Sequence, residues 1–101
     1  PIDVLLLGMG ADMHTASLFP GADRLAEALV PDAPILIPIR APGAAEPRLT
    51  LSARVLADAM ACHILITGAE KRAAVERAES LPAEEAPVAA VLSNATVHWA
   101  P

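Results

Sequence analysis

A carboxylate and an imidazole lie two residues apart in a glycine-rich segment near the start of the sequence. Asp12 and His14 follow Gly8 and Gly10, which come directly after an apolar run at 2–7. Glycine lets backbone N–H groups approach a ligand closely, so this segment could form an anion-binding nest. A neutral imidazole can take a proton from water near neutral pH, and a carboxylate beside it can fix its tautomer. The spacing therefore indicates a site that activates water, with His14 as base and Asp12 as its partner.

Three other interpretations of this segment remain open on the residues alone. Gly8, Gly10 and Met13 have the spacing of a dinucleotide fingerprint that lacks its third glycine, and the acidic residue expected on the second strand has no clear counterpart. Asp12 and His14 could bind a metal ion, but no other His or Cys has ligand spacing. A solitary histidine in a loop is also often a solvated or capping residue. Catalysis is thus one hypothesis among several.

The elements around this segment are those of an α/β protein. Apolar runs at 2–7 and 63–67 each end in glycine, a pattern typical of parallel strands that are buried on both faces. Helical spacing begins near Ser52 and recurs over 69–81, and a last strand is expected at 95–99. Strands alternating with helices predict a Rossmann-like three-layer sandwich with a mainly parallel, twisted sheet. Ligands bind beyond the carboxyl ends of such strands, where the glycine turns lie.

Shorter segments complete the expected fold. The sequence predicts helical segments at 15–18 and 22–29, and an edge strand at 35–39 because Pro38 cannot donate a ladder hydrogen bond. The segment 88–92 is ambiguous between helix and strand. Because the sequence opens on proline and passes at once into a strand, we expect residues 1–101 to be a single partial domain, the C-terminal portion of a larger fold.

The composition excludes several classes of partner. The formal charge is −5, and the only aromatic residues are Phe19 and Trp99, which argues against nucleic-acid and anionic-membrane binding. Cys62 is the single cysteine, so no internal disulfide can form, and it is expected to be a small buried hydrophobe. No apolar run reaches the roughly 20 residues that span a bilayer. A cytoplasmic location is the resulting expectation.

The run LGMGADMHTASLFPG, residues 7–21, resembles the signature of the 6-phosphogluconolactonase family, LGMGxDGHTASLFPG. Glucosamine-6-phosphate deaminases of the same fold begin similarly but continue as IAFNEP. The segments PRLTL at 47–51 and ITGAEK at 66–71 are similar to further family segments, and the ending resembles the family's closing strand. The resemblance therefore spans essentially the whole chain. It departs at Met13, where the family has glycine.

The resemblance implies hydrolysis of 6-phospho-D-glucono-1,5-lactone to 6-phosphogluconate, in the pentose phosphate pathway, without a metal or organic cofactor. It implies that His14 acts as general base and that Asp12 orients it. The residues that it assigns to the sugar-phosphate lactone are Gly8, Gly10, Arg48 and Lys71. Two alternatives remain: a deaminase- or isomerase-like enzyme, and a sugar-phosphate-binding relative in which Met13 has disabled hydrolysis. The oligomeric state is left open.

Overall fold

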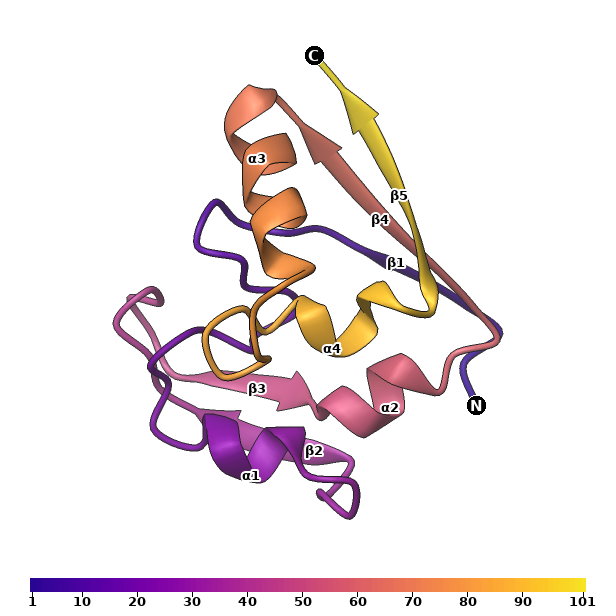
Figure 1. The fold of residues 1–101 in the computed structure, drawn as a ribbon. Helices are drawn as coiled ribbons and strands as arrows, with labels where there is room; N and C mark the ends of the chain where they lie inside the picture. Colours follow the sequence, from indigo (N-terminus) through magenta and orange to yellow (C-terminus); the bar gives the residue numbers. More distant parts are fainter.

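A computed structural model describes all residues 1–101, which fold into two sheets and four short helices (Figure 1). The strands are β1 (Val4–Leu7), β2 (Leu36–Ile39), β3 (Arg48–Leu51), β4 (Ala61–Thr67) and β5 (Ala95–Ala100). The helices are α1 (Leu25–Leu29), α2 (Ala53–Ala57), α3 (Ala69–Ala78) and α4 (Ala89–Leu92). The mixed order of strands and helices confirms the α/β class.

The larger sheet has three strands in the order β1-β4-β5, and both pairs are parallel. Parallel neighbours need a crossover, and the two crossovers differ. The chain between β1 and β4 contains α1, the second sheet and α2, whereas α3 and α4 alone connect β4 to β5. The expected parallel sheet is confirmed, and Leu7 at the carboxyl end of β1 pairs with Ile64, three residues before β4 ends. The two strands run in the same direction (Figure 1).

The two faces of this sheet differ in burial. On the face toward the helices, Cys62, Ile64 and Ile66 of β4 are almost fully buried in the core. On the other face, Val4 and Leu6 of β1 and Leu65 of β4 are 67%, 66% and 57% exposed. The expectation that these two strands are buried on both faces is therefore wrong, because no helix or strand of the chain packs on that side of the sheet. The chain supplies two layers of the sandwich, the sheet and one layer of helices.

The second sheet pairs β2 with β3 in antiparallel register, with Pro38 opposite Leu49. Both strands of a two-stranded sheet are edges, where proline is tolerated, and the edge-strand prediction is confirmed. The strand β3 has no counterpart among the elements predicted from the sequence. Its four residues follow Pro47 and lead within two residues into α2, so they offered no separate strand signal.

The predicted helix at 15–18 is wrong. Thr15 and Leu18 form an isolated antiparallel bridge, and the Leu18 backbone N–H donates to the Thr15 carbonyl at 3.0 Å. Ala16 between them has a φ of 50°, which a right-handed helix excludes. The ambiguous segment 88–92 contributes the helix α4. None of the four helices has the length and apolar character needed to cross a membrane.

Candidate active site

The segment after β1 is a tight turn held by its own hydrogen bonds. The Gly10 N–H donates to the His14 carbonyl at 3.1 Å, and the Met13 N–H donates to the Gly10 carbonyl at 2.9 Å. The hydroxyl of Thr15, which is 1% exposed, donates to the Gly8 carbonyl at 2.8 Å. These bonds close the chain on itself directly beyond the strand, so the backbone that carries the side chains of the turn is held in place.

Asp12 and His14 form the hydrogen-bonded pair that the sequence suggested. The Nδ1 atom of His14 lies 2.5 Å from Oδ1 of Asp12, and the same oxygen accepts the His14 backbone N–H at 3.1 Å. Partial burial acts to raise the pKa of Asp12, but the hydrogen bonds and charge of His14 outweigh it and the pKa lies below its ordinary value. An ionised Asp12 accepts a hydrogen bond from Nδ1–H, which leaves Nε2 of His14 as the free nitrogen.

Gly10 gives this pair the space that it occupies. A Cβ atom at position 10 would lie 2.4 Å from the His14 ring and 2.7 Å from Oδ1 of Asp12. Both distances are far below van der Waals contact, so any side chain here would displace the pair. Gly8, by contrast, has no atom within 4 Å of its would-be Cβ. The two glycines of the motif therefore have different roles.

Met13, which stands where the resemblance places glycine, has a φ of 69°. This is the left-handed region, which costs residues other than glycine about 1–2 kcal/mol. The Met13 side chain is half-buried and packs against the core, and its carbonyl accepts the Val88 N–H at 3.0 Å. The backbone thus keeps the conformation that suits glycine, and the larger side chain lies against the core.

A pocket of about 430 Å³ lies at the carboxyl ends of β1 and β4. It is lined by Leu6, Leu7, Gly8, Met9, Gly10, His14, Ala16 and Lys71. Four of the six predicted site residues are in this set, and a fifth, Asp12, holds His14. Lys71 lies in the first turn of α3, where the helix dipole also favours an anion, and it forms no ion pair. The pocket therefore combines a base with a free cation.

Arg48, unlike the other five predicted site residues, neither lines the pocket nor hydrogen-bonds to a residue that does. It lies on β3, and its guanidinium is 5.9 Å from the centroid of the Phe19 ring. Phe19 in turn is stacked on His14, with 4.3 Å between ring centroids and 22° between ring planes. Phe19 was not among the predicted site residues. Its only signal was that it is the single phenylalanine of the chain and lies within the motif.

The turn after β4 is held by the C-terminal strand. Gly68, with a φ of 88°, is the N-cap of α3, and its N–H donates to the Ala100 carbonyl at 2.9 Å. The indole Nε1–H of Trp99 donates to the Gly68 carbonyl at 2.8 Å, and the Arg72 guanidinium lies over the indole ring at 4.6 Å. Trp99 therefore fixes the start of the helix that carries Lys71, a role that sequence reasoning missed.

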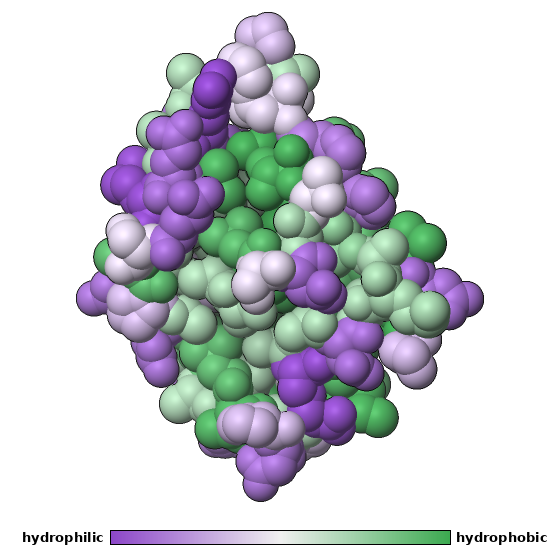
Figure 2. All heavy atoms as spheres, turned by 45° about the vertical axis from the view of Figure 1, so that its right-hand side comes forward, coloured by the Kyte–Doolittle hydropathy of each residue, from purple (hydrophilic) through white to green (hydrophobic).

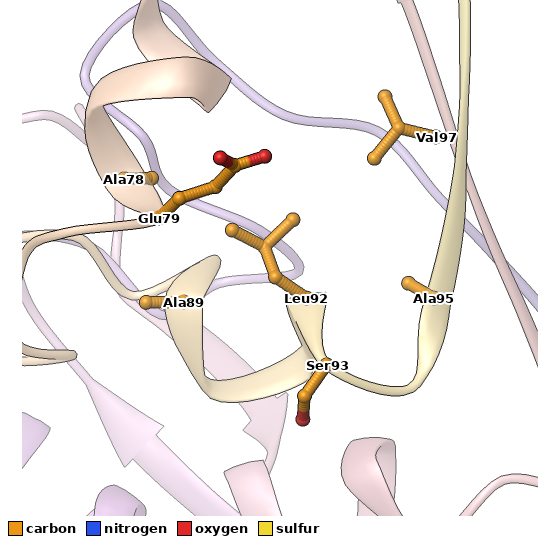
Figure 3. A pocket seen from close by; sticks show the side chains of 7 residues that line it. All are labelled: Ala78, Glu79, Ala89, Leu92, Ser93, Ala95 and Val97. Carbon is orange, nitrogen blue, oxygen red and sulfur yellow. The ribbon is translucent and has the colours of Figure 1, made fainter.

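A second pocket, of about 420 Å³, lies between the end of α3, α4 and β5 (Figure 3). Its polar side chains are Glu79 and Ser93, with no imidazole and no cation among the residues that line it. Figure 2 shows that apolar surface gathers on the side of the molecule that holds β5. This pocket lacks the groups for the chemistry predicted above.

No group of three or more His, Cys, Asp or Glu side chains is arranged to hold a metal ion. The histidines outside the motif, His63 and His98, hydrogen-bond to each other at 2.9 Å on β4 and β5. Cys62 is buried, as expected, and burial raises the pKa of its thiol. The titratable groups that could act on a ligand are thus concentrated in the first pocket.

Fold and site together define an α/β protein with a histidine–carboxylate pair and a lysine at the carboxyl ends of adjacent parallel strands. Residues 1–99 match the family described as glucosamine-6-phosphate isomerases/6-phosphogluconolactonase, and the chain belongs to that family.

Individual relatives agree with this assignment. The chain is 46% identical to a 6-phosphogluconolactonase of Mesorhizobium japonicum and 45% identical to one of Rhizobium meliloti. All of the chain is covered in both comparisons, with 44% and 46% of the relatives. The crystal structure of a 6-phosphogluconolactonase from Shewanella baltica superposes with a TM-score of 0.92 at 29% identity, covering 100% of this chain and 45% of that one. The chain thus spans under half the length of these relatives.

Proposed function

We propose that this chain carries the water-activating site of a 6-phosphogluconolactonase, which hydrolyses 6-phospho-D-glucono-1,5-lactone to 6-phosphogluconate. The observation that carries the proposal is the Asp12–His14 pair, joined at 2.5 Å, in a pocket that also contains Lys71. In this proposal residues 1–101 form one partial domain of the enzyme. The names of the relatives support the substrate, and the segment 15–20 favours lactonases over deaminases.

His14 acts as the general base. Its Nε2 takes a proton from water as the water oxygen attacks the lactone carbonyl carbon, and a tetrahedral intermediate with a negative oxygen forms. The carbon–ring-oxygen bond then breaks, and the imidazolium returns its proton to the leaving alkoxide. The products are a carboxylic acid, which loses its proton to solvent, and a free hydroxyl. Asp12 holds Nδ1 and stabilises the imidazolium, so it acts through His14.

The remaining groups bind the charged parts of the substrate. The backbone N–H groups of Gly8 and Met9 are candidate donors to the intermediate's oxygen, since both residues line the pocket with His14, whereas the Gly10 N–H already donates to the His14 carbonyl. Lys71 is the candidate phosphate ligand because it is a cation in the first turn of a helix. Arg48 is a further candidate phosphate ligand, but its guanidinium must move away from Phe19 to reach the pocket. No metal or organic cofactor takes part in these steps.

The first test is hydrolysis of the lactone by the complete gene product, corrected for spontaneous ring opening. His14→Ala should lower kcat by about 10²–10⁴-fold, the usual contribution of a general base. His63→Ala is the matched control, because it removes an imidazole that is absent from the pocket lining. A folded gene product without activity above background would refute the proposal and leave a sugar-phosphate-binding relative. Restored activity in Met13→Gly would then identify Met13 as the cause.

The second test separates phosphate binding from chemistry. Lys71→Ala should raise KM by about 10–100-fold, the loss of one charge-assisted hydrogen bond, with kcat changed far less. Arg77→Ala is its control, since it removes one positive charge from the last turn of the same helix. An unchanged KM in Lys71→Ala would exclude Lys71 as a phosphate ligand.

A further inference from the structure

Phe19 is buried against the active site and not in the main core. It is 3% exposed, yet it does not belong to the cluster of 18 buried residues that forms the hydrophobic core. Its ring lies flat on the His14 imidazole, with centroids 4.3 Å apart and planes inclined by 22°. The chain reversal between Thr15 and Leu18 returns Phe19 to the histidine five residues before it. The local fold thus serves to bring these two rings together.

The surroundings of Phe19 hold its ring in this position. A Cβ atom on Gly43 would lie 3.1 Å from Cδ1 of Phe19 and 3.2 Å from Oδ2 of Asp12. The backbone at position 43 therefore lies against both partners of His14 at once. The Arg48 guanidinium also lies 5.9 Å from the centroid of the Phe19 ring. The ring is consequently enclosed by a loop, a cation and the imidazole.

Two contacts together define the orientation of an imidazole, and His14 has both. The Asp12 carboxylate fixes Nδ1 but leaves the ring free to turn about that hydrogen bond. The stacked Phe19 ring opposes this rotation, since the imidazole would lose its face-to-face contact. With Nδ1 and one ring face occupied, Nε2 is the nitrogen left for water. A π-face is also favourable to the positive charge that His14 gains when it takes a proton.

We infer that Phe19 is a positioning residue for the proposed hydrolysis, acting through His14 and not on the substrate. This inference rests on the proposed function of His14 as base. General-base catalysis depends first on geometry, and small displacements of a catalytic group reduce the rate steeply. Phe19 holds the imidazole plane so that Nε2 faces the pocket while Nδ1 stays on Asp12.

The test compares variants of the complete gene product that lack or keep the aromatic ring. Phe19→Leu and Phe19→Met remove the ring and keep apolar bulk, whereas Phe19→Tyr keeps it. Leu56→Val, a substitution of a core residue on α2, is the control for a general loss of packing. Thermal unfolding first confirms which variants fold. Nitrogen-15 NMR of the His14 ring then reports its tautomer without substrate, and steady-state kinetics report kcat and KM.

We expect the parent protein, Phe19→Tyr and Leu56→Val to carry the neutral-state proton of His14 on Nδ1. In Phe19→Leu and Phe19→Met the ring can turn about the Asp12 hydrogen bond, so Nδ1 should keep its proton while the His14 ring signals shift and broaden, with kcat reduced about tenfold and KM changed by less than about twofold. Parental His14 ring signals and a parental kcat in both ring-less variants would overturn the inference. Shifted and broadened ring signals in a protein without lactonase activity would instead refute the proposed function and retain the positioning role.

Discussion

Two glycine turns follow neighbouring parallel strands in this protein, and they are held in different ways. The turn after β1 is fixed mainly by contacts within its own segment, since Asp12, His14 and Thr15 bond to one another or to the turn, and the Val88 N–H adds one distant bond to the Met13 carbonyl. The turn after β4 is fixed from a distance, because the Trp99 indole reaches Gly68 across 31 residues. The first presents the His14 imidazole and the second the Lys71 ammonium group. In the proposed function, proton transfer would therefore depend on local sequence, and anion binding on the tertiary fold.

Gly10→Ala breaks the local turn and should have the largest effect. The new Cβ would lie 2.4 Å from the His14 ring, so the imidazole or the Asp12 carboxylate must move. We expect kcat to fall by about 100-fold, as for other displaced catalytic groups, while the phosphate subsite is unaffected. Steady-state kinetics measure the loss, and NMR of the His14 ring detects the displaced pair.

Gly8→Ala is the matched control for this prediction, because its Cβ would meet no atom within 4 Å. The His14 ring signals and the thermal stability of this variant should match those of the parent. A parental kcat in Gly10→Ala would show that the Asp12–His14 geometry is not used in catalysis.

Trp99→Phe breaks the distant support of the second turn and should have an intermediate effect. The variant keeps an aromatic ring but loses the Nε1–H that bonds to the Gly68 carbonyl. Loss of one hydrogen bond of this kind corresponds to about 1 kcal/mol of stability. The start of α3 then holds Lys71 less firmly, so KM should rise several-fold, by about 2–5-fold, with kcat unchanged.

Arg72→Gln is the comparison for Trp99→Phe. It removes the cation over the indole and leaves the indole hydrogen bond intact. KM in this variant should stay close to the parental value. If Trp99→Phe lowers kcat and leaves KM unchanged, the C-terminal strand supports His14 and not Lys71. The proposed contrast between a locally held turn and a distantly held turn would then be wrong.

The same contrast between local and distant contacts explains which features could be predicted from the sequence and which could not. The Asp12–His14 pair was predictable because glycine spacing and residue chemistry act within one short segment. Buried apolar runs ended by glycine likewise predicted β1 and β4. Their pairing in a parallel sheet then brought Lys71 to the same pocket.

Contacts between distant segments were not predictable in this way. Arg48 follows a loop whose path depends on the second sheet, and nothing in its own neighbourhood indicates that it lies against Phe19. The exposed face of β1 was misjudged for a related reason. An apolar run shows that a strand can be buried on both faces, but burial depends on which elements pack there. The helix predicted at 15–18 is wrong because the backbone of Ala16 is left-handed. An alanine gives no indication in the sequence that its φ will be positive.

The smallest predicted effect concerns the backbone strain of the local turn. Ala16 and Met13 are the two non-glycine residues with positive φ, at 50° and 69°. Ala16 is exposed, so Ala16→Gly relieves strain with little loss of packing and should raise the free energy of unfolding by about 1 kcal/mol. Met13→Gly relieves similar strain but removes a side chain that packs on the core, so its stability should change by less than about 1 kcal/mol.

Denaturant unfolding of these two variants, with Met13→Val beside them, measures the strain separately from the packing. Valine is stiff at χ1 and fits the left-handed region poorly, so Met13→Val should lose about 1–2 kcal/mol. If Met13→Gly is as stabilising as Ala16→Gly, the Met13 side chain contributes no packing, and its presence in place of glycine only costs stability. If Met13→Val is neutral, the turn relaxes to another backbone conformation. The turn after β1 would then be less rigid than its hydrogen bonds indicate, and the two turns would differ less in how firmly local contacts hold them.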